Sequence, residues 1–218
     1  ERETLGCACA LPYWPQRSLL QNEVLVSGMP LAAMPVESLY KPWSSDSGNA
    51  YGAQRGLYRG EPARRMQSVY ASLDIEVPAR FAAMPDHLTL ELELMALLLD
   101  AGNAAAAATV ASEHLDWLDD YDAVLAGRTR DLAGATRLND ACRAQLAEGI
   151  AHLRALVAVA CRSAREATAA GGQVAARTFA CAREAAPSSE AARAREAAPT
   201  QAAAPTSKEP LALCGDVR

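Results

Sequence analysis

Bulky apolar residues recur along most of this chain at spacings of three and four, which is the period of an amphipathic helix. The clearest case follows Pro85, where Leu88, Leu92, Met95 and Leu99 lie along one face. Further leucines between these positions indicate that this helix is buried on more than one side. The same spacing predicts helices over residues 62–73, 104–125 and 135–170, and a shorter one around residues 17–26. The pattern therefore predicts an all-α protein.

Glycine and proline mark where these helices should end. Prolines divide residues 1–60 into short pieces, and the Ser- and Gly-rich stretch 44–60 is typical of a loop. Gly102-Asn103 should end the helix that follows Pro85, and Gly171-Gly172 should interrupt the last helix. Beyond residue 185 the chain is rich in Ala and Pro and buries too little surface to order itself. We expect a compact helical domain over residues 1–184, irregular at its start, and a disordered tail over residues 185–218.

Composition narrows the class of protein. Half of the residues are hydrophobic but only 5% are aromatic, so much of the hydrophobic fraction is helix-favouring alanine. The net charge of −5 argues against a general nucleic-acid binder, which needs a basic face. We see no run of 18 apolar residues and no secretory signal, so no membrane insertion is expected. The six cysteines lack zinc spacing and are expected to be free thiols in a reducing cytoplasm.

The pair Asp86-His87, at a predicted helix start, is the most suggestive local feature. Asp86 lies where a carboxylate can accept backbone N–H bonds as an N-cap, and Glu91 follows His87 by one turn on the same face. An enzyme would use the pair as a general acid and base, but no nucleophile or metal ligand stands at a recognisable spacing. The alternative is a capping aspartate beside a surface histidine.

A second polar cluster begins at Glu113-His114. Four aspartates follow within about two turns: Asp116, Asp119, Asp120 and Asp122. Adjacent helical residues point about 100° apart, so Glu113 and His114 cannot easily share one set of metal ligands. The acidic run is either a solvated helix face or an attractive surface for a basic peptide. Because no recognisable phosphate-binding or hydrolase motif is present, we expect no catalytic residues, no metal and no cofactor.

Four short segments carry the motifs of one known family. Residues 34–40, Met-Pro-Val-Glu-Ser-Leu-Tyr, match a proline-bearing ESVY loop, and residues 56–61, Gly-Leu-Tyr-Arg-Gly-Glu, match the stretch before the next helix. Residues 85–95 match a hallmark DH helix, and residues 113–118 match an EHL…W element. In this order and spacing they resemble the TorD/DmsD/NarJ family of chaperones for molybdenum-containing redox enzymes.

The resemblance implies a single compact helical bundle of the TorD-like type that acts as a chaperone and not as an enzyme. Family members bind the N-terminal signal peptide of a DMSO-reductase-type catalytic subunit in the cytoplasm. They hold that subunit until its molybdenum cofactor is inserted before export. The expected partner is such a subunit, bound by a monomer or dimer of this chain. Only 34 residues precede Pro35, so the helices that family members carry before the loop, and with them the N-terminal side of the groove, are expected to be either missing or rebuilt.

The resemblance assigns client binding to the DH helix and the ESVY-like loop. A twin-arginine signal peptide has a basic patch followed by an apolar segment, so its receptor should be an apolar helical groove with acids at its rim. The expected rim acids are Asp86, Glu91, Glu93, Glu113 and Asp116. The expected client-binding residues are Pro35, Glu37, Ser38, Tyr40, Pro85, Asp86, His87, Glu91, Glu113 and His114.

Two other classes stay open. A small metal-binding or hydrolytic helical enzyme would use Asp86, His87 and Glu91, and a stoichiometric transition metal in the purified protein would favour it. A helical adaptor would bind a different partner, and identification of the bound protein after co-purification would separate it from a chaperone.

Overall fold

The computed structural model describes residues 14–46 and 48–185, and its elements are α-helices and short 3-10 helices. The α-helices are α1 (Trp14–Glu23), α2 (Glu61–Ser72), α3 (Leu88–Asp100), α4 (Ala104–His114), α5 (Leu118–Asp131) and α6 (Asp140–Ala185). The 3-10 helices are η1 (Glu37–Leu39), η2 (Ala79–Phe81) and η3 (Leu132–Gly134). Among these residues the β-type pairing is limited to one isolated bridge between Val36 and His87. The expected all-α class is confirmed.

The described residues up to Arg177 belong to one compact unit. The predicted tail lies outside the described residues apart from Ala185, so the disorder of the tail and the domain boundary before residue 185 stay predictions. Helices α1, α2 and α3 match the predicted segments to within three residues at their starts.

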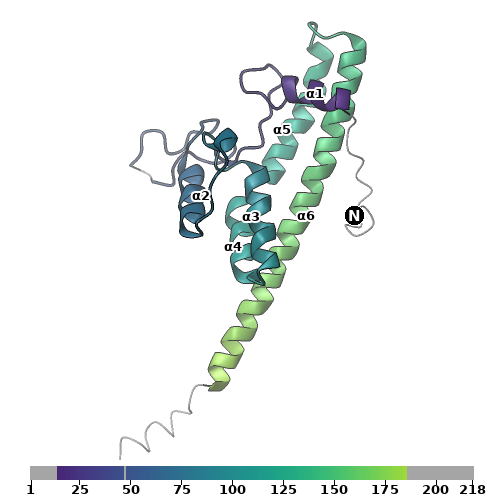
Figure 1. Cartoon of the computed structure of the whole chain (residues 1–218). Helices are drawn as coiled ribbons and strands as arrows, with labels where there is room; N and C mark the ends of the chain where they lie inside the picture. The colour runs from purple at the N-terminus through teal and green to yellow at the C-terminus, as the bar shows by residue number, and fades with distance from the viewer. Residues whose placement is uncertain (1–13, 47, 186–218) are drawn as a thin grey trace, which may run out of the picture. The chain divides into compact units, whose positions relative to one another are not determined.

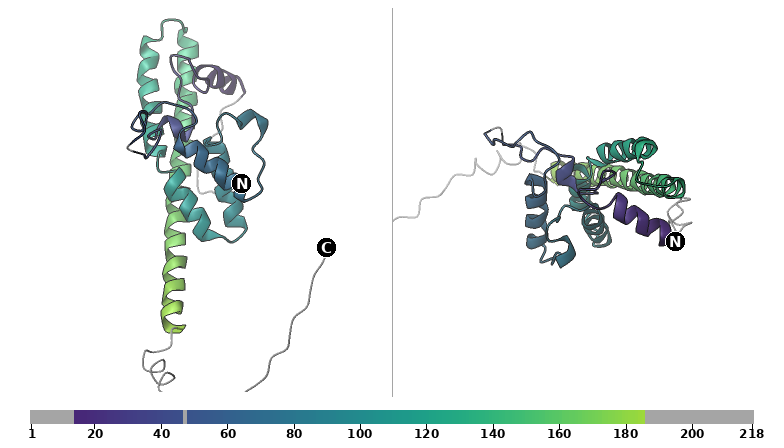
Figure 2. Two further views of the ribbon diagram at one scale, coloured as in Figure 1. Left: turned by 90° about the vertical axis from the view of Figure 1, so that its left-hand side faces the viewer. Right: turned by 90° about the horizontal axis from the view of Figure 1, so that it is seen from above.

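Within this unit, α5 and α6 run antiparallel and α3 and α4 form a second pair beside α6 (Figure 1). The Arg154 guanidinium binds the Asp122 carboxylate at 2.8 Å and so joins α6 to α5. Figure 2 shows α1 beside the upper part of the α5–α6 pair, where Leu20 lies against Gly149 of α6. Helix α2 packs against η1. The irregular segment between α1 and α2 therefore begins at a helix that packs beside α5 and α6, and its helix η1 packs against α2.

The prediction of one continuous helix over residues 104–125 is wrong, because the structure divides this segment into α4 and α5. Helix α4 ends at His114, and the His114 carbonyl oxygen accepts a hydrogen bond from the Trp117 indole nitrogen at 2.7 Å. The break buries Leu115, Trp117 and Leu118 together. A continuous helix would turn Trp117 and Leu118 about 100° apart, so core packing overrides the local helical pattern.

The last predicted helix differs too. Helix α6 begins at Asp140, and it continues through Gly171 and Gly172 instead of stopping there. Gly171 faces α4 so closely that a β-carbon would overlap the β-carbon of Ala108. Close approach of two helix backbones, and not a chain break, is therefore the reason for this glycine.

By length and composition, the part of α6 from Asp140 to Gln173 is long and apolar enough to cross a membrane, which the search for continuous apolar runs did not reveal. One face of this part packs into the core. Its buried residues are Leu146, Ile150, Val157, Ala160, Ala164 and Ala167. Packing of this face against the core therefore accounts for part of the apolar character of α6, since 28% of its most apolar window is buried.

Candidate functional site

An apolar groove of about 790 Å³ opens between α3 and α6. Leu92 of α3 and Leu153 and Leu156 of α6 lie on its facing walls. Pro35, from the loop before η1, and His87, at the start of α3, also line it. The groove therefore brings together residues from both of the motifs that the sequence singled out.

Backbone hydrogen bonds join these two motifs. The Leu88 nitrogen donates to the Pro35 oxygen at 2.9 Å, and the Glu37 nitrogen donates to the Asp86 oxygen at 3.0 Å. These bonds flank the antiparallel bridge between Val36 and His87. Because hydrogen bonds join these two segments on either side of the bridge, the loop and the start of α3 together form one wall of the groove.

Asp86 faces the interior and not the groove. Its side chain is fully buried, and its Oδ2 atom accepts hydrogen bonds from the Ser38 backbone nitrogen, at 2.7 Å, and from the Ser38 hydroxyl. Burial raises the pKa of Asp86, while these hydrogen bonds act in the opposite direction. The prediction that Asp86 caps the helix is wrong, because its carboxylate is committed to the loop.

His87 is the residue that caps α3. Its Nδ1 atom accepts a hydrogen bond from the Thr89 backbone nitrogen at 3.2 Å. Burial lowers the pKa of His87, which favours the neutral ring that this bond requires. The ring packs 4.8 Å from that of Phe81, within the groove lining. Asp86 and His87 therefore face different surroundings, which argues against an acid–base pair.

Glu37 is the centre of a buried ionic cluster on the other side of the loop. Its Oε2 atom lies 2.9 Å from His114 Nδ1, and its Oε1 atom lies 2.7 Å from Lys41 Nζ. Lys41 also contacts the Asp116 carboxylate and the Glu113 carbonyl oxygen, both at 2.5 Å. Burial acts to lower the pKa of Lys41, but the carboxylates of Glu37 and Asp116 outweigh it and raise the pKa. This cluster ties η1 to α4.

Glu91 joins the same cluster from α3, and its side chain is fully buried. Neither of its oxygen atoms meets an ordinary hydrogen-bond donor among the described residues. Burial, and then the charge of Glu37, raise the pKa of Glu91 well above its usual range. A raised pKa favours the protonated, uncharged form of this buried carboxyl group.

Glu37, Glu91 and His114 each bring one possible metal-ligating atom within 4.8 Å of the others. However, Lys41 already binds one oxygen of Glu37, and His114 binds the other. An ammonium group thus lies where the charge of a cation would be needed. The arrangement fits an internal ionic cluster better than a metal centre.

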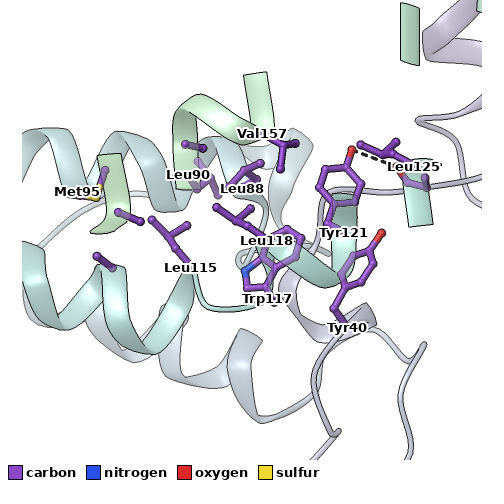
Figure 3. Close-up of a cluster of buried hydrophobic side chains, with 14 of the residues drawn as sticks. Tyr40, Leu88, Leu90, Met95, Leu115, Trp117, Leu118, Tyr121, Leu125 and Val157 are labelled. Atoms are coloured by element: carbon purple, nitrogen blue, oxygen red, sulfur yellow. Dashed lines mark hydrogen bonds between the residues drawn. The ribbon is translucent and has the colours of Figure 1, made fainter. Parts of the chain in front are cut away.

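Aromatic side chains of the core contact the loop that contains η1. The Tyr40 ring stacks on Trp117 with centroids 5.0 Å apart, and it meets Tyr121 edge-on at 5.4 Å (Figure 3). The Tyr40 hydroxyl donates to the Met34 oxygen at 3.0 Å, and the Tyr121 hydroxyl donates to the Ala33 oxygen at 3.3 Å. Tyr40 therefore holds the loop in place from the core.

The expected acidic rim is wrong for two of its members, because Asp86 and Glu91 are buried. The other three expected rim acids, Glu93, Glu113 and Asp116, do not line the groove. The acidic run after His114 also has partners within the chain. The ion pairs are Lys41–Asp116, Arg165–Asp119, Arg55–Asp120 and Arg154–Asp122. Each aspartate of this run therefore already has a basic partner within the chain.

The ten expected client-binding residues thus divide into three groups. Pro35 and His87 line the apolar groove. A second group is buried and does not line the groove: Glu37, Ser38, Tyr40, Pro85, Asp86, Glu91 and His114. The third is Glu113, which is exposed beside the ionic cluster.

Sequence reasoning missed three residues that shape the site. Lys41 neutralises Glu37, and Arg80 and Phe81 line the groove. The available signal for the last two was a basic and aromatic pair between Pro78 and Pro85, in a segment with no helical period.

Neither a comparison with curated proteins nor one with solved structures found a match. The sequence model of one protein family, the nitrate reductase delta subunit, matches residues 22–131, which is half of the chain. The matched range contains the loop, the DH helix and the ionic cluster that joins them. The resemblance to the TorD/DmsD/NarJ chaperones is thereby confirmed, and this chain belongs to the nitrate reductase delta subunit family.

Proposed function

We propose that this chain is a cytoplasmic, system-specific chaperone for the catalytic subunit of a molybdenum-containing oxidoreductase of the DMSO-reductase type. It binds the apo subunit through its N-terminal signal segment and assists cofactor loading and assembly before export. Family membership supports the general role, because the nitrate reductase delta subunit family consists of maturation chaperones for molybdoenzymes and not of enzymes.

The observation that carries the proposal is the apolar groove beside both family motifs. An apolar helical segment of a client would lay its face between α3 and α6, as helices do in other hydrophobic grooves. Buried apolar surface contributes about 25 cal/mol per Å² before the costs of association are subtracted. Groove burial would therefore supply most of the affinity.

The buried polar groups have a supporting role in this mechanism. Asp86, Glu37 and Glu91 fix the loop and the start of α3 relative to each other, so the groove wall is formed before a client arrives. A preformed wall lowers the ordering cost of binding. On this view the DH motif contributes to recognition through His87, while Asp86 positions it.

Co-purification of tagged full-length chain from its native host, with mass spectrometry, tests the proposal. Leu156 is 38% exposed and lines the groove, whereas Leu97 is 56% exposed and does not line it. We expect a molybdoenzyme catalytic subunit to be recovered with the wild-type chain and with Leu97→Glu, but not with Leu156→Glu. Calorimetric titration with the N-terminal segment of that subunit should show the same ranking.

Two results would argue against the proposal. One is recovery of a partner outside the molybdoenzymes that binds both variants equally, which would favour the adaptor class. The other is a molybdoenzyme subunit that binds Leu156→Glu as tightly as the wild-type chain, which would place client binding on another surface. Circular dichroism and thermal unfolding of both variants show whether each is folded.

A further inference from the structure

The charge of the groove is the opposite of what a receptor for a basic peptide needs. Among the residues that line it, the ionisable side chains are those of Arg80 and His87. Of the carboxylates near these residues in sequence, Asp86 and Glu91 are fully buried, and Glu76 and Glu93 are exposed but do not line the groove. The groove therefore offers a cation and no carboxylate to whatever enters it.

Arg80, Phe81 and His87 form a small cluster on the wall opposite α6. The Arg80 guanidinium carbon lies 4.9 Å from the centre of the Phe81 ring, and the His87 ring lies 4.8 Å from it. Arg80 is exposed, and no carboxylate of the described residues forms an ion pair with it. Its contact with Phe81 leaves its N–H groups available for a ligand.

His87 adds a directed donor to this cluster. Because its Nδ1 atom accepts the hydrogen bond from Thr89, the neutral ring carries its proton on Nε2. The cluster therefore presents a guanidinium and an imidazole N–H beside an apolar wall. Such a set matches a carboxylate that borders an apolar helix face.

We propose that the client segment in this groove carries a carboxylate side chain beside its apolar face, and that Arg80 binds this carboxylate while His87 donates to it from Nε2. The inference rests on the proposed function and specifies the chemistry of the bound segment. Any arginines of the client signal lie outside the groove, because inside it they would meet Arg80 with no compensating acid.

The test uses three synthetic amphipathic helical peptides that share one leucine-rich face and differ at the flanking positions, which are Glu, Gln or Lys. Each is titrated into the full-length chain and into Arg80→Glu, and Arg64→Glu serves as the control. Arg64 is also exposed and also lies over an aromatic ring, that of Trp43, but it does not line the groove.

We expect the wild-type chain to bind the Glu peptide about three- to tenfold more tightly than the Gln peptide, and the Lys peptide more weakly still. Arg80→Glu should reverse this order, and Arg64→Glu should keep it. The preference for Glu should shrink as salt is added. Leucine-dependent binding with no preference, or with a preference for Lys, overturns the inference and leaves the proposed function intact. Failure of all three peptides to bind overturns the groove as the client site, and the inference with it.

Discussion

Ser38 donates two hydrogen bonds to one oxygen of Asp86, from its backbone nitrogen at 2.7 Å and from its hydroxyl. Both residues are completely buried. The contact links the ESVY-like loop to the DH motif and fixes the orientation of His87 at the groove. Asp86 is thus an anchor whose effect on client binding passes through its neighbours.

Replacement of Asp86 should therefore lower the stability of the fold, and any loss of client binding should follow from that. We expect Asp86→Ala to lower the free energy of unfolding by about 2–4 kcal/mol, because it leaves the buried Ser38 N–H without an acceptor. Asp86→Asn should cost less, since its amide oxygen can still accept. Urea unfolding measures both, and Asp100→Ala, at the exposed end of α3, should stay within about 0.5 kcal/mol of wild type. A fully stable Asp86→Ala variant that has lost client binding would instead indicate direct contact between Asp86 and the client.

Glu91 should make stability fall as pH rises. Its folded pKa lies above the usual 4.5, so above about pH 4.5 the unfolded chain loses a proton that the folded chain retains. The contribution is present below that pH and is lost as pH rises through the folded pKa. Glu91→Gln should remove this fall, because the amide does not titrate. Unfolding free energies across the pH range measure it, and Glu93→Gln, an exposed change in the same helix, should retain the wild-type slope.

His87 should make stability fall as pH decreases, which is the opposite of the effect of Glu91. Its folded pKa lies below the usual 6.5, so the unfolded chain takes up a proton first as pH falls. The stability that it contributes is present above about pH 6.5 and is lost as pH falls through the folded pKa, when a protonated Nδ1 can no longer cap α3. His87→Asn keeps a capping acceptor and should weaken this dependence, as unfolding between about pH 5 and pH 7 will show. An unchanged slope would mean that the cap does not titrate.

Two adjacent glycines offer a matched test of the contact between α4 and α6. Gly171→Ala should destabilise the protein by about 1–3 kcal/mol, because its methyl group would overlap Ala108. Gly172→Ala meets nothing within 4 Å and should stabilise the helix by about 0.5–1 kcal/mol. Thermal unfolding of the two variants compares them directly. Equal effects would indicate that the helices do not approach closely at this point.

The helices could be predicted because their signal is local. Apolar residues at spacings of three and four located α2 and α3 well, since a helix of that length buries one continuous stripe. The break between α4 and α5 could not be predicted in the same way. There the helix ends so that Trp117 and Leu118 both reach a core built from other parts of the chain.

The sequence pointed to two segments for client binding, and that assignment stays a prediction. The structure shows that Pro35 and His87, one from each segment, line the same groove. The expectation that Asp86 and Glu91 lie at the rim of the groove was wrong. A carboxylate near a helix start has several possible hydrogen-bond partners, and the sequence does not show which one it takes. Lys41, placed by η1 next to Glu37, decides much of the electrostatics.

By itself the sequence determined an all-helical chain and its family, because periodicity and motif order depend on neighbours along the chain. Only the tertiary structure decided that Asp86 and Glu91 turn inward while Arg80 and His87 face the groove. The reason is that a buried carboxyl group needs partners, and the partner of Asp86, Ser38, comes from a distant loop.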